Sequence, residues 1–307
     1  MGEMGNSFPA RPLFVLTAKG MAREVLAHDG PMGRRSVARP IGGGAAGDRL
    51  TADIVPGLAT EWQVESEKQP GLAWVEGLIT LRTAGGTPIL MKYIGRRAAR
   101  YGEGAWRIGV GFEADAAGED GAHDWLNDVV AAATVEVRGD DLIYTVHELL
   151  GRKTAPDANA IAVDPVYHMV ASGTLGERIK IESQVAKRYL SIAESGCRTE
   201  GPLTAEWPVG FAWGAHRMGK GPMGFPFHID MKAEMVAENG DMIVQQYIGT
   251  NSRTLLDPSP DIDRSWRTTA MFEAPVDGPN AWLNEVVALG FGWVQGEETH
   301  YEYYAMR

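Results

Sequence analysis

The sequence predicts an all-β protein with two tandem domains related by internal duplication, and three observations support this fold class. A block with the order Trp-Arg, Phe-Glu and Trp-Leu-Asn occurs twice, at residues 106–127 and 266–284. Short runs of alternating or β-branched residues recur between Gly, Pro and Asp, which is typical of antiparallel sheet. Long segments with helical periodicity are scarce. Two β-barrels or β-sandwiches therefore fit better than any α/β arrangement.

The spacing of the repeat sets the domain organisation. The two copies are offset by about 155 residues, which is the size of a whole domain and excludes a solenoid unit. A chain of 307 residues accommodates two such domains. The join falls near the polar stretch 151–157, which ends in the Pro156-Asp157 pair. We predict domains at residues 1–155 and 156–307.

In the first half, the glycine stretch 42–47 is interpreted as a turn or barrel-rim loop, because it lacks the Gly-Lys-Ser/Thr of a phosphate loop. Residues 78–83 and 88–93 predict a hairpin joined by a Gly-Gly turn. Residues 106–113 predict a strand. Residues 125–137 are ambiguous, because the run 129–133 is also compatible with a helix.

The second half repeats these elements with local differences. Residues 231–236 and 242–248 predict the copy of the hairpin, with Asn239-Gly240 as its turn signal. The Gly/Pro-rich segment 206–228 is interpreted as a long loop that carries aromatic side chains. The copy of the ambiguous segment contains Gly290 and Gly292, which favours a turn followed by a strand.

The Trp-Arg strand sorts its side chains onto two faces, because successive residues of a strand point to opposite sides. Trp106 to Phe112 place apolar residues on one face, and Arg107 to Glu113 place charged and small residues on the other. The copy at 266–273 has the same parity. The charged face is either the solvated side of an ordinary sheet or the lining of a ligand-holding barrel, and the residues alone leave both open.

Composition excludes several classes of partner. A net charge of −11 without a Lys/Arg run argues against nucleic-acid and anionic-membrane surfaces. The sequence has neither a run near the ~20 apolar residues of a membrane helix nor a secretory signal. The single cysteine and the scattered histidines lack metal-ligand spacing, so we expect neither metal nor cofactor. We expect a cytoplasmic protein that binds a small molecule; a homo-oligomer is left open.

The order of these motifs resembles the domain-of-unknown-function family DUF 3237. The resemblance rests on Arg39-Pro40 with the glycines that follow, the Gly-turn hairpin, Trp106-Arg107, Phe112-Glu113 and Trp125-Leu126-Asn127, and it covers almost the whole chain twice. It implies two tandem lipocalin-like antiparallel β-barrels. The second half departs from the glycine element, with residues 191–196 in its place. Some tandem members resemble cofactor-independent lyases that decarboxylate lignin-derived phenylcoumaran acids.

The resulting hypothesis is a cofactor-independent lyase or decarboxylase for a small aromatic, phenolic carboxylic acid. In it an arginine holds the substrate carboxylate, a tyrosine or histidine manages the phenol proton, and a glutamate is the general acid or base. A non-catalytic small-ligand carrier and a cofactor-free isomerase or cyclase are the alternatives. The candidate catalytic residues are Arg267, Glu273, Tyr247, His228, Arg107, Glu113 and Tyr93, and the candidate substrate-binding residues are Trp213, Phe227, Asn284, Trp62 and Asn127.

Overall fold

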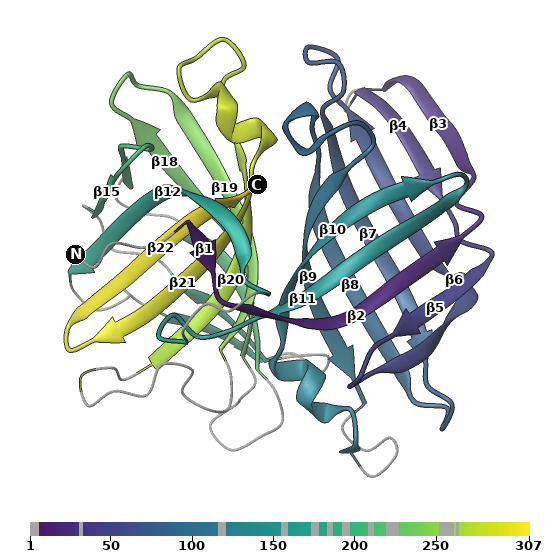
Figure 1. Cartoon of the computed structure of the whole chain (residues 1–307). Coiled ribbons are helices and arrows are strands. Elements are labelled where there is room, and N and C mark those ends of the chain that lie inside the picture. Colours follow the sequence, from purple (N-terminus) through teal and green to yellow (C-terminus); the bar gives the residue numbers. More distant parts are fainter. Residues whose placement is uncertain are drawn as a thin grey trace. The chain divides into compact units, whose positions relative to one another are not determined.

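A computed structural model describes residues 6–30, 33–115, 121–154, 159–172, 178–182, 187–191, 197–207, 212–218, 227–251, 261 and 264–307. The chain divides into two compact units (Figure 1). Arg11–Glu148 form one, called here the first barrel, and Leu149–Arg307 with Met1–Ala10 form the other, the second barrel. The domain boundary expected at residue 155 stays a prediction. None of the described helices is long and apolar enough to span a membrane.

The first barrel consists of ten strands and two short 3-10 helices among its described residues. The strands are β2 (Ala10–Lys19), β3 (Arg23–Gly30), β4 (Gly33–Ala38), β5 (Gly42–Ala46), β6 (Thr51–Glu65), β7 (Ala73–Arg82), β8 (Pro88–Arg97), β9 (Trp106–Ala114), β10 (Val130–Arg138) and β11 (Asp141–Leu149), and the helices are η1 (Ala99–Tyr101) and η3 (Asp124–Asp128).

The strands of the first barrel close into a cylinder. Hydrogen-bonded neighbours follow the order β6-β5-β2-β11-β10-β9-β8-β7, and β7 pairs with β6 again, so eight of the described strands form a ring. The long strand β6 is irregular between Ile54 and Ala59. Its first part pairs with β5 and its last part with β4, so the β3–β4 hairpin extends one end of the ring.

The second barrel contains twelve strands and one 3-10 helix among the residues that the structure describes. They are β1 (Ser7–Phe8), β12 (Ile161–Ser172), β13 (Arg178–Glu182), β14 (Lys187–Ser191), β15 (Cys197–Glu200), β16 (Ala205–Trp207), β17 (Ala212–Met218), β18 (Phe227–Ala237), β19 (Met242–Asn251), β20 (Arg264–Glu273), β21 (Val287–Gln295), β22 (Glu298–Met306) and η5 (Ala281–Glu285).

The second barrel repeats the topology of the first. The order β18-β16-β15-β12-β22-β21-β20-β19 closes through the β18–β19 pair, again with eight described strands, and β13, β14 and β17 extend it. The N-terminal strand β1 pairs with β12, and the Leu150 amide donates to the Pro9 carbonyl. These bonds place the described residues 6–10 in the second barrel. The prediction of two tandem antiparallel barrels is confirmed.

Both predicted hairpins are present as β7–β8 and β18–β19. Two local expectations are wrong, and one ambiguity is resolved. Residues 42–46 are strand β5 and not a loop, because these glycines let β5 lie between β2 and β6: a Cβ on Gly43 would meet the Thr17 carbonyl oxygen at 1.8 Å. The ambiguous run 129–133 follows the 3-10 helix η3 and belongs to strand β10 from Val130 on. The long loop expected at 206–228 contains strand β17.

Candidate functional site

A buried carboxylate lies inside the first barrel among hydrogen-bond donors. Glu61 on β6 is 0 % exposed. Its Oε1 accepts from Arg23 Nη2 at 2.8 Å and from Gln63 Nε2 at 3.3 Å. Its Oε2 accepts from the hydroxyls of Tyr93 at 2.9 Å and Tyr144 at 3.3 Å, and these two hydroxyls are 3.1 Å apart. We call Arg23, Glu61, Tyr93 and Tyr144 the Glu61 cluster.

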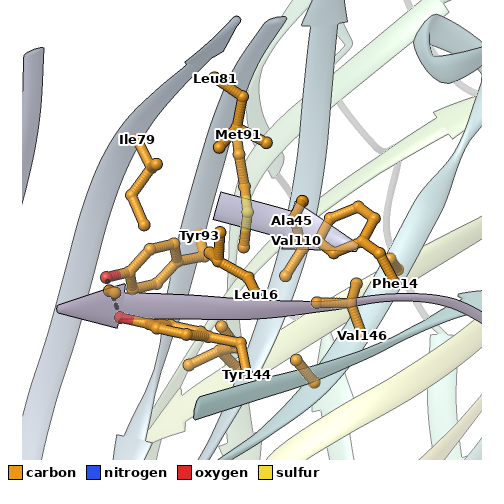
Figure 2. Close-up of a cluster of buried hydrophobic side chains, with 14 of the residues drawn as sticks. Phe14, Leu16, Ala45, Ile79, Leu81, Met91, Tyr93, Val110, Tyr144 and Val146 are labelled. Carbon is orange, nitrogen blue, oxygen red and sulfur yellow. Dashed lines mark hydrogen bonds between the residues drawn. The ribbon is translucent and has the colours of Figure 1, made fainter. Parts of the chain in front are cut away.

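The apolar core of the barrel continues directly from this cluster. Figure 2 shows the hydroxyls of Tyr93 and Tyr144 facing each other, with their rings among aliphatic side chains such as Leu16, Ile79 and Met91. The surroundings of the cluster therefore have a low dielectric constant, which strengthens electrostatic interactions within it.

Burial sets the protonation states of the cluster. Desolvation raises the pKa of Glu61 above its ordinary value of 4.5, against the opposing effects of the Arg23 charge and the hydrogen bonds. Desolvation also raises the pKa of Tyr93 and of Tyr144 well above 10.0, and the Glu61 charge adds to this. Both tyrosines therefore stay protonated near neutral pH and act as donors, which leaves Glu61 as the proton acceptor.

A glycine makes room for Tyr93. Gly77 on β7 is the cross-strand partner of both Glu61 and Tyr93. A Cβ on Gly77 would lie 2.0 Å from Cζ of Tyr93 and 2.3 Å from its hydroxyl oxygen. The Tyr93 ring thus crosses directly over Gly77 to reach the carboxylate.

The interior becomes more exposed along β6 beyond the cluster. Glu61, Gln63 and Glu65 share the inward face, because they alternate with outward residues. The exposed fraction of the side chain rises from 1 % at Glu61 to 27 % at Glu65, and it is 26 % at Arg23. Glu65 contacts Arg34 and Arg97, each at 3.4 Å. This more exposed end of the barrel is called here the rim.

Two polar atoms near the cluster are buried without a hydrogen-bond partner in the structure. They are Oε1 of Gln63, an acceptor, and Nε1 of Trp106, a donor. Both residues lie next to the cluster. Gln63 and Arg23 each donate a hydrogen bond to Glu61, and the Cζ of Arg23 lies 5.7 Å from the centroid of the Trp106 ring. Buried polar groups are nearly always satisfied, so these atoms mark places for the polar groups of a ligand or of water.

The second barrel lacks the carboxylate at the matching position. The sequence repeat aligns Tyr93 with Tyr247. In the strand register, Tyr247 pairs with Met231, and Met231 pairs with Gly214. Gly214 therefore occupies the place of Glu61, and Met231 occupies the place of Gly77. The Tyr247 hydroxyl donates to the Met231 sulfur at 3.1 Å, which is a weak acceptor.

Neutral polar groups and aromatic rings fill the described interior of the second barrel instead. The Tyr167 hydroxyl donates to Gln245 Oε1 at 2.7 Å, and Thr268 Oγ1 donates to the Tyr303 hydroxyl at 3.0 Å. The Tyr167 and Tyr303 rings are 5.0 Å apart. The two interiors have thus diverged while the strand order has been kept.

The Trp-Arg strands place their apolar face inward. Trp106 and Phe112 belong to the buried core of the first barrel, so Arg107 and Glu113 lie on the outer face of β9. Glu113 and Glu273 are exposed. The lumen placement considered for these charged residues is therefore wrong, because the bulky apolar side chains occupy the interior. Their predicted catalytic roles have no support from this geometry.

The two arginines of these strands have different surroundings. Arg107 is half-buried, and its Cζ lies 4.8 Å from the centroid of the Tyr101 ring. Desolvation lowers its pKa. Arg267 is 2 % exposed and donates Nη1 to the carbonyl oxygen of Leu149. Arg267 therefore holds the backbone at Leu149, which belongs to the second barrel.

The candidate asparagines form equivalent backbone clamps. Asn127 accepts from the Ala114 amide at 2.9 Å and donates to the Ala114 carbonyl at 3.0 Å. Asn284 makes the same two bonds to Ala274, both at 2.9 Å. Both pairs connect the 3-10 turn with the end of the Trp-Arg strand, which explains the repeated Trp-Leu-Asn motif structurally.

The other candidates divide as follows. Tyr93 lies in the Glu61 cluster and Tyr247 in the second interior. Trp62 is 39 % exposed and points away from the interior. The side chains of Trp213, Phe227 and His228 lie outside the described part of the structure.

The sequence analysis missed Arg23, Glu61 and Tyr144. A signal for Glu61 was present, because Glu61 and Gln63 flank Trp62 and alternate in phase with the core position Ala59. The phase differs from that of Ala52 and Ile54, because β6 is irregular between Ile54 and Ala59. No group of three His, Cys, Asp or Glu residues suited to a metal ion occurs among the described residues.

Comparison with known proteins finds similarity to solved structures over about half of this chain. No family model and no curated protein matches the chain. A β-barrel-like protein from Acinetobacter baumannii is 23 % identical (TM-score 0.40; 46 % of this chain, 96 % of that chain). A protein of unknown function from Rhodopseudomonas palustris is 18 % identical (0.40; 47 % and 98 %). An enzyme from Penicillium herquei is 16 % identical (0.35; 48 % and 99 %). Each of these solved structures spans about half of this chain.

Proposed function

We propose that the first barrel is a cofactor-independent lyase that decarboxylates a small phenolic carboxylic acid by acid–base chemistry at the Glu61 cluster. The observation that carries this proposal is the internal comparison between the barrels. The same strand order forms around Glu61 in one copy and around Gly214 in the other. The fold therefore does not need a buried carboxylate at this position.

Energetics support a functional reading of Glu61. Burying an ion costs several kcal/mol, and well-packed apolar replacements of buried ion pairs are often neutral or stabilising. The fold can omit this carboxylate, its pKa is raised by desolvation, and two tyrosine hydroxyls lie within hydrogen-bond distance. These are the properties of a general base.

The cluster suits a substrate that supplies its own electron sink. Glu61 accepts the phenol proton while the hydroxyls of Tyr93 and Tyr144 donate to the substrate oxygen. The phenolate electrons then expel a benzylic oxygen, which takes a proton from solvent, and a quinone methide forms. When the bond to the carboxylate breaks, its electron pair forms a double bond conjugated with the ring and regenerates the phenolate. Carbon dioxide leaves, and the phenolate recovers its proton from Glu61.

The proposal is tested by incubating the purified protein with a panel of phenolic acids and following ultraviolet absorbance and carbon dioxide release. The Glu61→Gln variant keeps the shape of the side chain but cannot accept the proton. We expect turnover by the wild type and a loss of at least about a hundredfold in the variant, the usual contribution of a general base. Equal turnover by both proteins would refute the role of Glu61.

A carrier function is the second candidate, and the second barrel favours it. The described interior there combines four tyrosines with Trp266 and lacks an acid in the place of Glu61; the tyrosines are Tyr167, Tyr247, Tyr301 and Tyr303. Such an interior suits binding of a flat aromatic molecule without proton transfer. Saturable binding of a phenolic acid to a protein that releases no carbon dioxide would favour this reading for the whole chain.

A further inference from the structure

We infer that the first barrel binds a two-ended ligand, a hydroxyaryl carboxylate, with the hydroxyl at Glu61 and the carboxylate at the rim arginines Arg34 and Arg97. This inference rests on the site of the proposed function and adds the orientation of the substrate and the residues that select its charge. Neither arginine belongs to the Glu61 cluster.

The rim arginines face the interior and share one carboxylate. Arg34 is the cross-strand partner of Glu65, and Arg97 is the partner of Trp106, so all four side chains lie on the inward face of the barrel. Glu65 bridges Arg34 and Arg97 through its two oxygens. Two guanidinium groups thus share the single carboxylate of Glu65. A planar guanidinium is also the group best suited to grip a carboxylate.

The inner end favours a hydroxyl group over a second anion. Glu61 is a fully buried acidic group there, and the tyrosine hydroxyls stay protonated. A phenol donates a hydrogen bond to the Glu61 carboxyl group and accepts from the tyrosines, whereas a second acidic group beside Glu61 in this desolvated site would be disfavoured in its charged form. The two ends of the interior therefore recognise different groups.

The distance between the ends matches one aromatic ring with a short side chain. Glu61 and Glu65 are four residues apart on β6, which corresponds to about 13 Å. Gln63 lies midway on the same face, and Trp106 is the strand neighbour of Arg97. The unpartnered Gln63 Oε1 and Trp106 Nε1 thus lie along the path between the ends, where a ring substituent such as a hydroxyl or ether oxygen is able to bind them.

Stopped-flow quenching of tryptophan fluorescence tests the inference, because it measures binding before turnover. The probes are 4-hydroxycinnamate, its methyl ester and cinnamate, which lacks the hydroxyl. For wild type we expect both the ester and cinnamate to bind about tenfold more weakly than 4-hydroxycinnamate, a modest value because the rim is partly solvated.

Variants assign each preference to one end. The double variant Arg34→Gln/Arg97→Gln should lose the preference for acid over ester and keep the preference for the hydroxyl. Glu61→Gln should lose the preference for the hydroxyl and keep the preference for acid over ester. Arg82→Gln is the control for the loss of an arginine away from the rim, because Arg82 lies at the far end of β7 and bonds to the Gly86 carbonyl. It should retain both preferences.

The outcomes separate this inference from the proposed reaction. An acid-over-ester preference that survives the double rim variant, or the absence of saturable binding by all three probes, overturns the inference. Binding with the expected preferences but without carbon dioxide release supports the inference and counts against the lyase. Carbon dioxide release with the same KM in wild type and the rim variant supports the lyase and counts against the inference.

Discussion

Glu61 is held in the interior by three kinds of donor, and its raised pKa connects the site with stability. A carboxyl whose folded-state pKa lies above its unfolded value binds protons more tightly when folded. Its contribution to stability is therefore complete below the unfolded value of 4.5 and is lost as pH rises through the higher folded-state pKa.

This linkage predicts a pH-dependent difference between wild type and Glu61→Gln. Glutamine does not titrate. The Tm of the wild type should therefore fall relative to the Tm of the variant as pH rises above about 4.5 toward neutrality. Thermal unfolding of both proteins across this range measures the difference. A constant difference in Tm would mean that the pKa of Glu61 is the same in the folded and unfolded chain.

Gly77 offers a second test at the residue scale. In Gly77→Ala the new methyl group would overlap the Tyr93 ring, so Tyr93 must leave Glu61. We expect a destabilisation of about 1–3 kcal/mol from overpacking, together with reduced turnover. Gly111→Ala is the matched control, because a Cβ on Gly111 meets nothing within 4 Å. Chemical denaturation that shows equal effects for both variants would contradict the close approach of Tyr93 to Gly77.

At the scale of elements, Arg267 on strand β20 holds the backbone at Leu149 within the second barrel. Arg267→Lys keeps the positive charge but loses the planar donor group at the Leu149 carbonyl. We expect a loss of about 1–3 kcal/mol in the free energy of unfolding with kcat/KM nearly unchanged. A tenfold fall in kcat/KM without a loss of stability would instead support the substrate clamp that the sequence suggested for this residue.

Strand parity explains both what the sequence predicted and what it missed. The alternation at 106–113 sorts Trp106 and Arg107 onto opposite faces, and the structure keeps that sorting. The inward face is the one with bulky apolar side chains, because burying them gives more free energy than burying charges. Strand β6 is an exception, because the polar residues Glu61 and Gln63 lie on its inward face. Hydrophobic patterning alone would wrongly assign them to the solvent-exposed face.

At the scale of the whole molecule, the duplication made the fold predictable and left the site hidden. The repeated Trp-Leu-Asn motif contains Asn127 and Asn284, whose hydrogen bonds to the backbone stabilise each barrel. The carboxylate of the Glu61 cluster is absent from the repeat, because the second copy has Gly214 at the position of Glu61. Features that both copies share reflect the fold, and the catalytic proposal rests on a feature that only one copy has. The cluster also joins β3, β6, β8 and β11, which only the closed barrel brings together.

The central claim is that the first barrel, and not the second, performs the chemistry. Tyr93→Phe and Tyr247→Phe remove the same atom from matching positions, and kcat/KM for carbon dioxide release from a phenolic acid compares them directly. We predict a fall of about ten- to hundredfold for Tyr93→Phe, because a donor to the reacting oxygen is lost. Tyr247→Phe should stay within about twofold of wild type, because its hydroxyl bonds only weakly to the Met231 sulfur. A loss in Tyr247→Phe that equals or exceeds the loss in Tyr93→Phe would contradict the account.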